Sequence, residues 1–230
     1  NKLESPDLNI VTVEDPIEYD LDNINQAQIN TKSGVTFSSA LRSILRQDPD
    51  IIMVGEVRDE ETVELGIRAA LTGHLVFSTV HTNDAASGFT RLLNWNVEPF
   101  LIASTVKGIL AQRLVRRVCK ECRESYDASE EELRMIGLDA KETFKAYKGK
   151  GCLSCRNTGF KGRIGIYELL LVDAEISELV LEQAPGYKIR EQARKSGMRT
   201  LLEDGVLKIN RGDTTISEVY ETLGTTKIII

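Results

Sequence analysis

The stretch DPDIIMVGEVRD at residues 48–59 decides the fold class that this 230-residue chain predicts. Four consecutive apolar residues, Ile51–Val54, are typical of a strand that is buried on both faces in a parallel sheet. Pro49 ends the helical pattern before it, because proline disfavours the helical conformation in the preceding residue. The strand delivers Glu56 and Arg58 at its carboxyl end, which is where open α/β sheets bind ligands. We therefore predict an α/β fold with a functional site at this edge.

Outside this stretch, strand and helix patterns alternate along the first half of the chain, which is typical of an α/β sheet with mostly parallel strands. The predicted strands are 9–14, 51–54 and 75–80, and the predicted helices are 36–47, 59–71, 84–93 and 99–110. Residues 112–118 fit either a strand or the end of a helix. From residue 173 onward the pattern is mostly helical, and capping-box spacings predict helix starts at Ser129 and Thr215.

The composition limits the classes of protein to which the chain can belong. Hydrophobic residues make up 41% and charged residues 28%, a soluble globular mix that excludes collagen-like, low-complexity and wholly disordered chains. The apolar runs are far shorter than the roughly 18 to 20 residues that a membrane span requires. A formal net charge of -6 argues against binding nucleic acid through bulk electrostatics. Because no secretory signal opens the chain, we expect the cytosol as its compartment.

Carboxylates gather at the ends of two predicted strands. Glu56 could orient or deprotonate a water molecule and Arg58 could contact phosphate oxygens, although the two could equally form a solvated ion pair. Glu14 and Asp15 follow the first predicted strand, so they could lie at the same edge and hold Mg²⁺ directly or through water. The alternative for Glu14 and Asp15 is an ordinary turn before a proline.

The two histidines of the chain, His74 and His81, lie on either side of the predicted strand 75–80. Their hydroxyl and amide neighbours make a polar edge that could recognise a phosphate. A lone histidine is more often a structural residue, and for His74 both interpretations stay open.

The four cysteines form two close pairs, Cys119-x-x-Cys122 and Cys152-x-x-Cys155, with 29 residues between them. Disulfides rarely persist in a reducing compartment, so this spacing indicates a metal site. Two such knuckles supply four thiolates in the tetrahedron that zinc prefers, and four thiolates leave no position for a substrate. The predicted zinc site is therefore structural, with a redox-active cysteine pair as the alternative.

Several segments resemble three motifs of the secretion-superfamily hexameric ATPases: the Asp box, the Walker B motif and the His box. They are VEDPIE at 13–18, the long segment 34–62, TGHLVFSTVHTNDA at 72–85 and AQRLVRRVC at 111–119. The nearer likeness is to the ATPases of type II secretion and type IV pilus assembly. This resemblance implies a RecA-like P-loop NTPase core, incomplete at its amino terminus. The implied domains are a partial core at 1–118, a tetracysteine zinc subdomain at 119–172 and a helical region at 173–230.

The resemblance implies a role for each carboxylate. Glu56 would be the Walker B glutamate that activates water, and Glu14 and Asp15 would organise Mg²⁺ and the attacking water. Arg58 follows the glutamate in the family motif and would hold the site together.

The resemblance also implies ligands and partners. His74 and His81 would form the His box, which senses the γ-phosphate of ATP and links neighbouring subunits. The implied cofactors are ATP, Mg²⁺ and a structural Zn²⁺. The implied partners are a homo-hexamer, the inner-membrane platform and other secretion or pilus assembly proteins, with no nucleic acid. The chain would then be part of a cytoplasmic motor, peripherally associated with the inner membrane, that couples ATP hydrolysis to pilus or pseudopilus assembly.

The chain departs from the family pattern because it carries no phosphate-binding loop of the form G-x-x-x-x-G-K-[ST]. Its only Gly-Lys pair, Gly149-Lys150, is followed by Gly151 and has Phe144 where the first glycine belongs. In the family this loop lies just upstream of the segment that matches residues 9–18. We therefore expect this chain to bind ATP poorly and to turn over little by itself. We also expect its sheet to be incomplete or completed by another chain.

Three other interpretations stand beside the assembly motor. The first is a non-catalytic, zinc-stabilised interaction module that docks an inner-membrane platform. A retraction motor is disfavoured because that branch generally lacks the cysteine pairs, and a hexameric helicase is disfavoured by the acidic balance of charges. The sequence alone does not separate type II secretion from type IV pilus assembly.

Overall fold

Contacts within the computed structural model, which describes residues 7–141 and 143–224, divide the chain into two compact units. The first unit comprises Asn1–Ile109 with Leu171–Gln192, and the second comprises Leu110–Leu170 with Ala193–Ile230. The helical region predicted after residue 173 therefore contributes to both units. The domain boundaries predicted at residues 118 and 172 stay a prediction.

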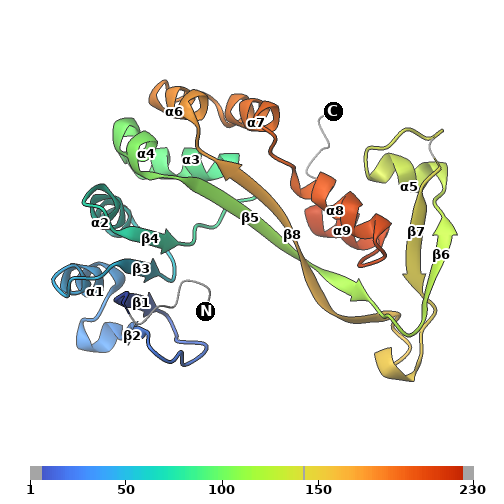
Figure 1. The fold of residues 1–230 in the computed structure, drawn as a ribbon, viewed down its shortest axis with the longest axis horizontal. Helices are drawn as coiled ribbons and strands as arrows, with labels where there is room; N and C mark the ends of the chain where they lie inside the picture. The colour runs from blue at the N-terminus through green and yellow to red at the C-terminus, as the bar shows by residue number, and fades with distance from the viewer. Residues whose placement is uncertain (1–6, 142, 225–230) are drawn as a thin grey trace. The chain divides into compact units, whose positions relative to one another are not determined.

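The first unit is built on a four-stranded parallel sheet with the strand order β2-β1-β3-β4 (Figure 1). Its strands are β1 (Ile10–Glu14), β2 (Asn25–Gln28), β3 (Ile51–Val54) and β4 (Leu75–Ser78). Ile10 is aligned with Ile51, and Ile51 is aligned with Leu75. Because the strands are parallel and in register, the carboxyl ends of β1, β3 and β4 meet at one edge of the sheet.

The predicted strands of the first unit are confirmed, and one strand was missed. β1 and β3 carry the fully buried side chains of Val13 and Ile52, as their apolar runs predict. β4 ends at Ser78 rather than at Val80. β2 was not predicted because its sequence, NQAQ, contains neither an apolar run nor a β-branched residue. It forms because its backbone pairs with β1.

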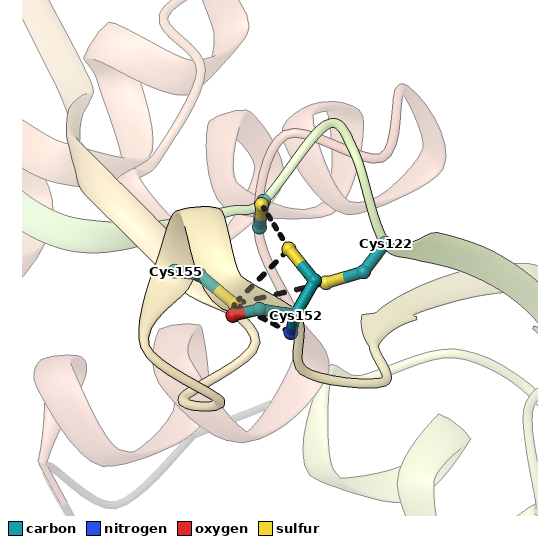
Figure 2. A group of neighbouring side chains, drawn as sticks. Cys122, Cys152 and Cys155 are labelled. Atoms are coloured by element: carbon teal, nitrogen blue, oxygen red, sulfur yellow. Dashed lines mark hydrogen bonds between the residues drawn. The ribbon is translucent and has the colours of Figure 1, made fainter.

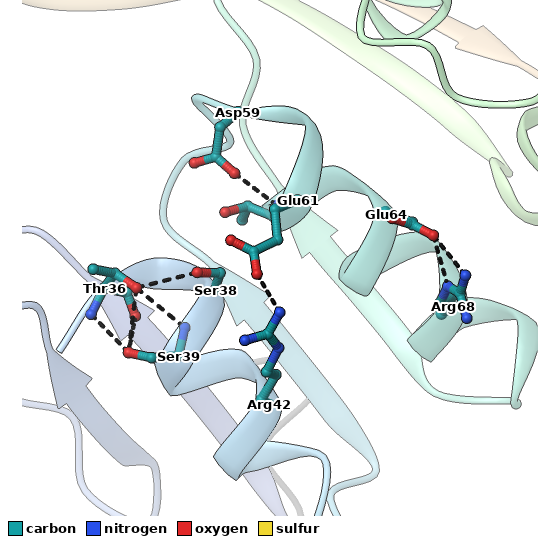
Figure 3. A network of polar contacts seen from close by, with 9 residues as sticks. Thr36, Ser38, Ser39, Arg42, Asp59, Glu61, Glu64 and Arg68 are labelled. Atoms are coloured by element: carbon teal, nitrogen blue, oxygen red, sulfur yellow. Dashed lines mark hydrogen bonds and ion pairs between the residues drawn. The ribbon is translucent and has the colours of Figure 1, made fainter. Parts of the chain in front are cut away.

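Helices of the first unit pack against this sheet and against one another. They are α1 (Phe37–Ile44), α2 (Glu60–Leu71), α3 (Ala86–Asn94), α4 (Pro99–Thr105), α6 (Ala174–Leu181) and the first part of α7 (Gly186–Lys195), with a 3-10 turn η1 (Thr31–Ser33) before α1. Thr36 and Asp59 cap the amino ends of α1 and α2 (Figure 3). Arg42 and Glu61 form an ion pair between these two helices. The position of α2 matters because the loop before it carries Glu56.

The second unit contains two small sheets. β5 (Gly108–Val118) pairs with β8 (Phe160–Leu171), and β6 (Arg123–Asp127) pairs antiparallel with β7 (Lys145–Gly149). The ambiguous segment 112–118 is therefore a strand, and α4 ends at Thr105 rather than near residue 110. The remaining elements are α5 (Glu130–Met135), η2 (Leu153–Cys155), α8 (Leu201–Asn210) and α9 (Ile216–Leu223). No helix of the described residues is both long enough and apolar enough to cross a membrane.

The two predicted capping boxes both start a helix, but only one of them is complete. At α5, Ser129 Oγ accepts a hydrogen bond from the Glu132 N–H, and the Glu132 carboxylate accepts one from the Ser129 N–H. At α9, Thr215 Oγ1 accepts from the Glu218 N–H at 3.2 Å, which is half of the box. The Glu218 carboxylate binds the guanidinium and the N–H of Arg116 instead. A charged, forked donor holds a carboxylate more strongly than a single backbone N–H.

Candidate functional site

The carboxyl edge of the sheet brings together residues from the exits of three strands. The chain turns closely at Gly55, whose N–H donates to the Val13 carbonyl at 2.8 Å. A Cβ atom at this position would lie 3.1 Å from the Val13 oxygen and 3.4 Å from the Glu14 Cα. Glycine therefore lets the exit of β3 run against the exit of β1. The exits of β3 and β4 are tied in turn by Thr79, whose Oγ1 donates to the Gly55 carbonyl at 2.7 Å.

Glu56 lies at the centre of this edge. One carboxylate oxygen, Oε1, forms an ion pair with Arg58, and the other, Oε2, lies 3.5 Å from His81 Nε2. Arg58 also approaches Asp15, with Nη1 at 3.8 Å from Oδ2. The structure thus brings together four of the predicted site residues from the exits of β1, β3 and β4.

The neighbours of Glu56 set its charge state. The hydrogen bond from Arg58 lowers the pKa of Glu56, burial of the carboxyl acts in the opposite direction, and His81 adds a further lowering. Only 18% of the Glu56 side chain is exposed. Glu56 is therefore a carboxylate at neutral pH and a weak base, which suits it to orienting a water molecule through a hydrogen bond.

Glu14 lies at the same edge, but its partners are different. Its Oε1 accepts from Thr12 Oγ1 at 2.5 Å and from Gln26 Nε2 at 2.9 Å. Thr12 and Glu14 share one face of β1, because side chains alternate along a strand. Gln26 is aligned with Thr12 on the neighbouring strand and lies on that face too. Sequence reasoning missed Gln26, because nothing in the NQAQ segment predicted a strand beside β1.

His74 is the predicted site residue that the structure does not bring to this edge. It precedes β4, whereas His81 follows that strand, so the two histidines lie at opposite ends of β4. The Nδ1 atom of His74 is 2.9 Å from the Ala69 carbonyl and 3.1 Å from Thr72 Oγ1. A hydrogen bond to a carbonyl oxygen requires Nδ1 to carry a proton, so this ring nitrogen donates to the end of α2. His74 thus closes the end of α2, and its nucleotide-binding role stays a prediction.

The four cysteines converge in the second unit, and Figure 2 shows the sulfur atoms of three of them turned toward one another. All four Sγ atoms lie within 4.8 Å of each other. Cys119 and Cys152 are 3.8 Å apart, Cys122 and Cys155 are 3.8 Å apart, and Cys152 and Cys155 are 3.7 Å apart. A regular tetrahedron with Zn–S bonds of about 2.3 Å has edges of about 3.8 Å, whereas a disulfide would need about 2 Å. The donor set and its geometry fit a tetrathiolate zinc site.

Backbone groups around the second knuckle favour the thiolate form that a metal requires. The Sγ of Cys155 accepts N–H groups of Cys152 at 3.2 Å and of Gly159 at 3.3 Å. Burial raises the pKa of Cys155, but these donors and the neighbouring thiols outweigh it and lower the pKa to about 6. Gly151 and Gly159 have φ of +95° and +76°, as the predicted tight turns require. The knuckle is therefore folded for binding a metal.

The chain matches the model of the family described as Type II/IV secretion system protein over residues 1–221. The chain belongs to this family. The motif resemblance is thereby confirmed, and so is the expected likeness to the type II secretion and type IV pilus assembly ATPases.

The similar proteins include both type IV pilus assembly ATPases and type II secretion ATPases. The type IV pilus assembly ATPase PilB of Thermus thermophilus is 51% identical over 220 residues, which are 95% of this chain and 25% of that protein. The type II secretion system ATPase E of Vibrio cholerae is 46% identical over 218 residues, which are 95% of this chain and 43% of that protein. The chain thus spans about a quarter to less than half of the length of these curated relatives.

A solved structure of a pilus motor has a fold similar to that of this chain. The pilus retraction motor PilT with bound ADP matches with a TM-score of 0.67 and 28% identity, over 94% of this chain and 52% of that one. The α/β fold of this chain therefore resembles that of a solved pilus motor.

Proposed function

We propose that this chain forms part of an ATP-hydrolysing motor subunit that powers pilus or pseudopilus assembly, in type IV pilus biogenesis or type II secretion. The observation that carries the proposal is the position of Glu56, which lies between Arg58 and His81 at the carboxyl edge of a parallel sheet. A nucleotide hydrolase needs a group that places water in line with the γ-phosphate, and a carboxylate at this edge can do so. Membership of the family and the names of the relatives support the same activity.

Each residue at the edge has a separate task in this proposal. Bound Mg²⁺ would neutralise the charge that develops on the transferred phosphoryl group. Glu56 accepts a hydrogen bond from the attacking water and orients it, while Arg58 and His81 keep the carboxylate in place. Glu14 and Asp15 would hold the metal directly or through its water ligands. The Arg58 guanidinium is 59% exposed and has N–H groups beyond the one that binds Glu56, so it can also contact a phosphate oxygen when ATP binds.

We assign the four-stranded sheet to a RecA-like core that lacks the strand and loop for the phosphates. β4 is an edge strand, and in the part of the chain that the structure describes it pairs with β3 alone. Leu75 and Phe77 lie on one face of β4 and are each 44% exposed, so the described residues leave this apolar face uncovered. Without the backbone amides and lysine of that loop, this chain by itself should bind ATP poorly.

The four-cysteine cluster is assigned a structural Zn²⁺ that stabilises the second unit. The four thiolates fill the tetrahedral shell, so the metal would act in folding and not in hydrolysis. We further propose that the complete subunit works as a cytoplasmic homo-hexamer on an inner-membrane platform, with no nucleic acid. In such a ring, neighbouring subunits share the nucleotide site and hydrolysis becomes relative domain rotation.

Calorimetric titration with a non-hydrolysable ATP analogue and Mg²⁺ tests the proposal. Two proteins are compared: this chain, and a chimera in which this chain replaces the matching segment of Thermus thermophilus PilB. We expect the chimera to bind the analogue and hydrolyse ATP, and the chain alone to bind at least about 100-fold more weakly, a difference of about 2.7 kcal/mol. Tight binding by the chain alone would refute the argument from the missing loop. A folded chimera that neither binds nor hydrolyses would refute the motor.

A second candidate is the non-catalytic, zinc-stabilised interaction module. It is favoured by one observation: all four ligands of the metal site lie within this chain. Cys119→Ser separates the two candidates, because the module should then lose its membrane-platform partner while the motor should chiefly lose stability. The measurements are partner capture and the ATPase rate of the chimera.

A further inference from the structure

We propose that Gln26 is a positioning residue for Glu14, and that it couples this carboxylate to the loop at residues 15–24. The inference rests on the proposed function, because Glu14 matters only if the edge binds Mg²⁺ and nucleotide. Gln26 belongs to β2, which carries none of the motif residues, so no motif points to it.

The hydrogen bonds of Gln26 fix the orientation of its amide. Its Oε1 accepts from the Leu21 N–H at 2.7 Å, while its Nε2 donates to Glu14 Oε1 at 2.9 Å and to the Tyr19 carbonyl at 3.1 Å. An amide has two N–H donors, and both are used here. A flipped amide would turn its oxygen toward two acceptors and its NH₂ group toward a donor. The amide therefore has one favourable orientation, and in it Nε2 faces Glu14.

The second hydrogen-bond donor to Glu14 is the hydroxyl of Thr12, which is also fixed in position. Thr12 is 3% exposed in the middle of β1, and its Oγ1 donates to the same carboxylate oxygen at 2.5 Å. Thr12 and Gln26 are register partners, so they reach Oε1 of Glu14 from two neighbouring strands. Within the described residues, Oε2 of Glu14 accepts no hydrogen bond. Gln26 and Thr12 thus hold one oxygen of the carboxylate and leave the other free to bind a metal ion.

The same amide also holds the loop that joins β1 to β2. Tyr19 and Leu21 belong to this loop, and both are exposed. A movement of the loop would change the bonds of Gln26 and thereby the position of the Glu14 carboxylate. The group around Glu56 follows β3 and β4, and it meets the loop where Arg58 approaches Asp15 at 3.8 Å. Gln26 bonds to neither of these two residues, so it should affect catalysis chiefly through Glu14.

Gln28 supplies a matched control on the same strand. It lies two residues beyond Gln26, on the same face, and its Oε1 accepts from the Ile17 N–H of the same loop at 3.3 Å. Gln28 therefore holds the loop without bonding to Glu14. A substitution of Gln28 therefore measures the change in kcat that loosening the loop causes. A substitution of Gln26 measures the same change together with the effect of losing the contact with Glu14.

The kinetic test uses the chimera, with ATP hydrolysis as the readout. Gln26→Leu should lower kcat about 10- to 100-fold, as is typical when an outer-shell partner of a metal ligand is removed. Its KM for ATP should stay within about threefold, and Gln28→Leu should change kcat by less than about twofold. In a Glu14→Gln background, Gln26→Leu should lower kcat no further, because the two residues act as one unit. Equal effects of Gln26→Leu with and without Glu14, or equal effects of the two glutamine variants, would overturn the proposal.

A second measurement does not depend on hydrolysis. In a ¹H–¹⁵N spectrum of this chain, Glu14→Ala should shift the side-chain NH₂ signals of Gln26 more than those of Gln28, which is aligned with Glu14 but does not bond to it. Unchanged Gln26 signals would overturn the proposed contact whatever the kinetics. An inactive chimera combined with shifted Gln26 signals would instead refute the motor and retain the contact.

Discussion

If the four-cysteine cluster binds zinc as proposed, replacing Cys155 by serine should weaken zinc binding and destabilise the second unit. The Sγ atom of Cys155 lies 3.8 Å from that of Cys122 and 3.7 Å from that of Cys152. It also accepts the backbone N–H groups of Cys152 and Gly159. A serine hydroxyl cannot take over, because it stays protonated at neutral pH and is a poorer zinc ligand than a thiolate.

The expected loss of zinc affinity is estimated by dividing the free energy of zinc binding equally among the four cysteine ligands. Structural zinc sites bind with about 10 to 16 kcal/mol of apparent free energy. Each of the four sulfurs lies 3.7 to 3.8 Å from at least one other, and all four lie within 4.8 Å of one another, so each is close enough to contribute one ligand. One ligand of four therefore accounts for about 3 kcal/mol, which corresponds to an affinity about 100-fold weaker.

Metal analysis and competition with a chromophoric chelator measure this effect. The unaltered chain should carry one zinc, with an X-ray absorption spectrum of four sulfurs at about 2.3 Å. Ser154→Ala is the matched control, because the Ser154 hydroxyl bonds Glu121 and Lys161 in the same knuckle and leaves the sulfurs alone. Cys155→Ser that holds zinc as tightly as this control would refute the reasoning, and so would a disulfide in a chain purified without oxidant.

Three further predictions concern single residues. Glu56→Gln in the chimera should leave binding of the ATP analogue within about threefold while kcat falls at least about 100-fold; a parallel loss of binding would contradict a role in the reaction step. Glu218→Ala should lower the free energy of unfolding by about 2 kcal/mol at pH 7, measured with urea. Because Arg116 lowers the pKa of Glu218, this contribution is present above the ordinary value of 4.5 and disappears as the pH falls through the lowered pKa, so the variant and the parent chain should converge in acid. Gly55→Ala should cost about 1 to 3 kcal/mol, since its Cβ would lie 3.1 Å from a backbone oxygen of β1, whereas Gly66→Ala in α2 should be neutral or stabilising; equal effects of the two would argue against the close turn.

Local sequence patterns predicted the central elements because the apolar run and the helix cap that define these elements involve residues close together in the sequence. The apolar run Ile51–Val54 is a strand with the predicted bounds, and Ser129 and Glu132 complete their capping box. The segment 112–118, QRLVRRV, was ambiguous because its sequence fits either a strand or the end of a helix. Pairing of β5 with β8, which is distant in sequence, makes it a strand.

The candidate site was predicted in part for the same reason. Glu56 and Arg58 are two residues apart, and their ion pair follows from the strand that presents them. His81 joins them because β4 lies beside β3. The same strand carries His74 to its other end, and a motif that contains both histidines does not reveal this separation.

The sequence by itself determined the α/β class, the family, the residues at the strand exits and the four cysteines of the candidate metal site, because each of these depends on residue type and short spacing. Only the tertiary structure decided that NQAQ forms a strand beside β1, that Gln26 bonds to Glu14, and that Glu218 binds Arg116 in place of its own helix cap. Arg116 and Glu218 are 102 positions apart in the sequence. Contacts of this kind depend on which backbones lie side by side, and the competition between a local and a distant partner is settled only when the chain is folded.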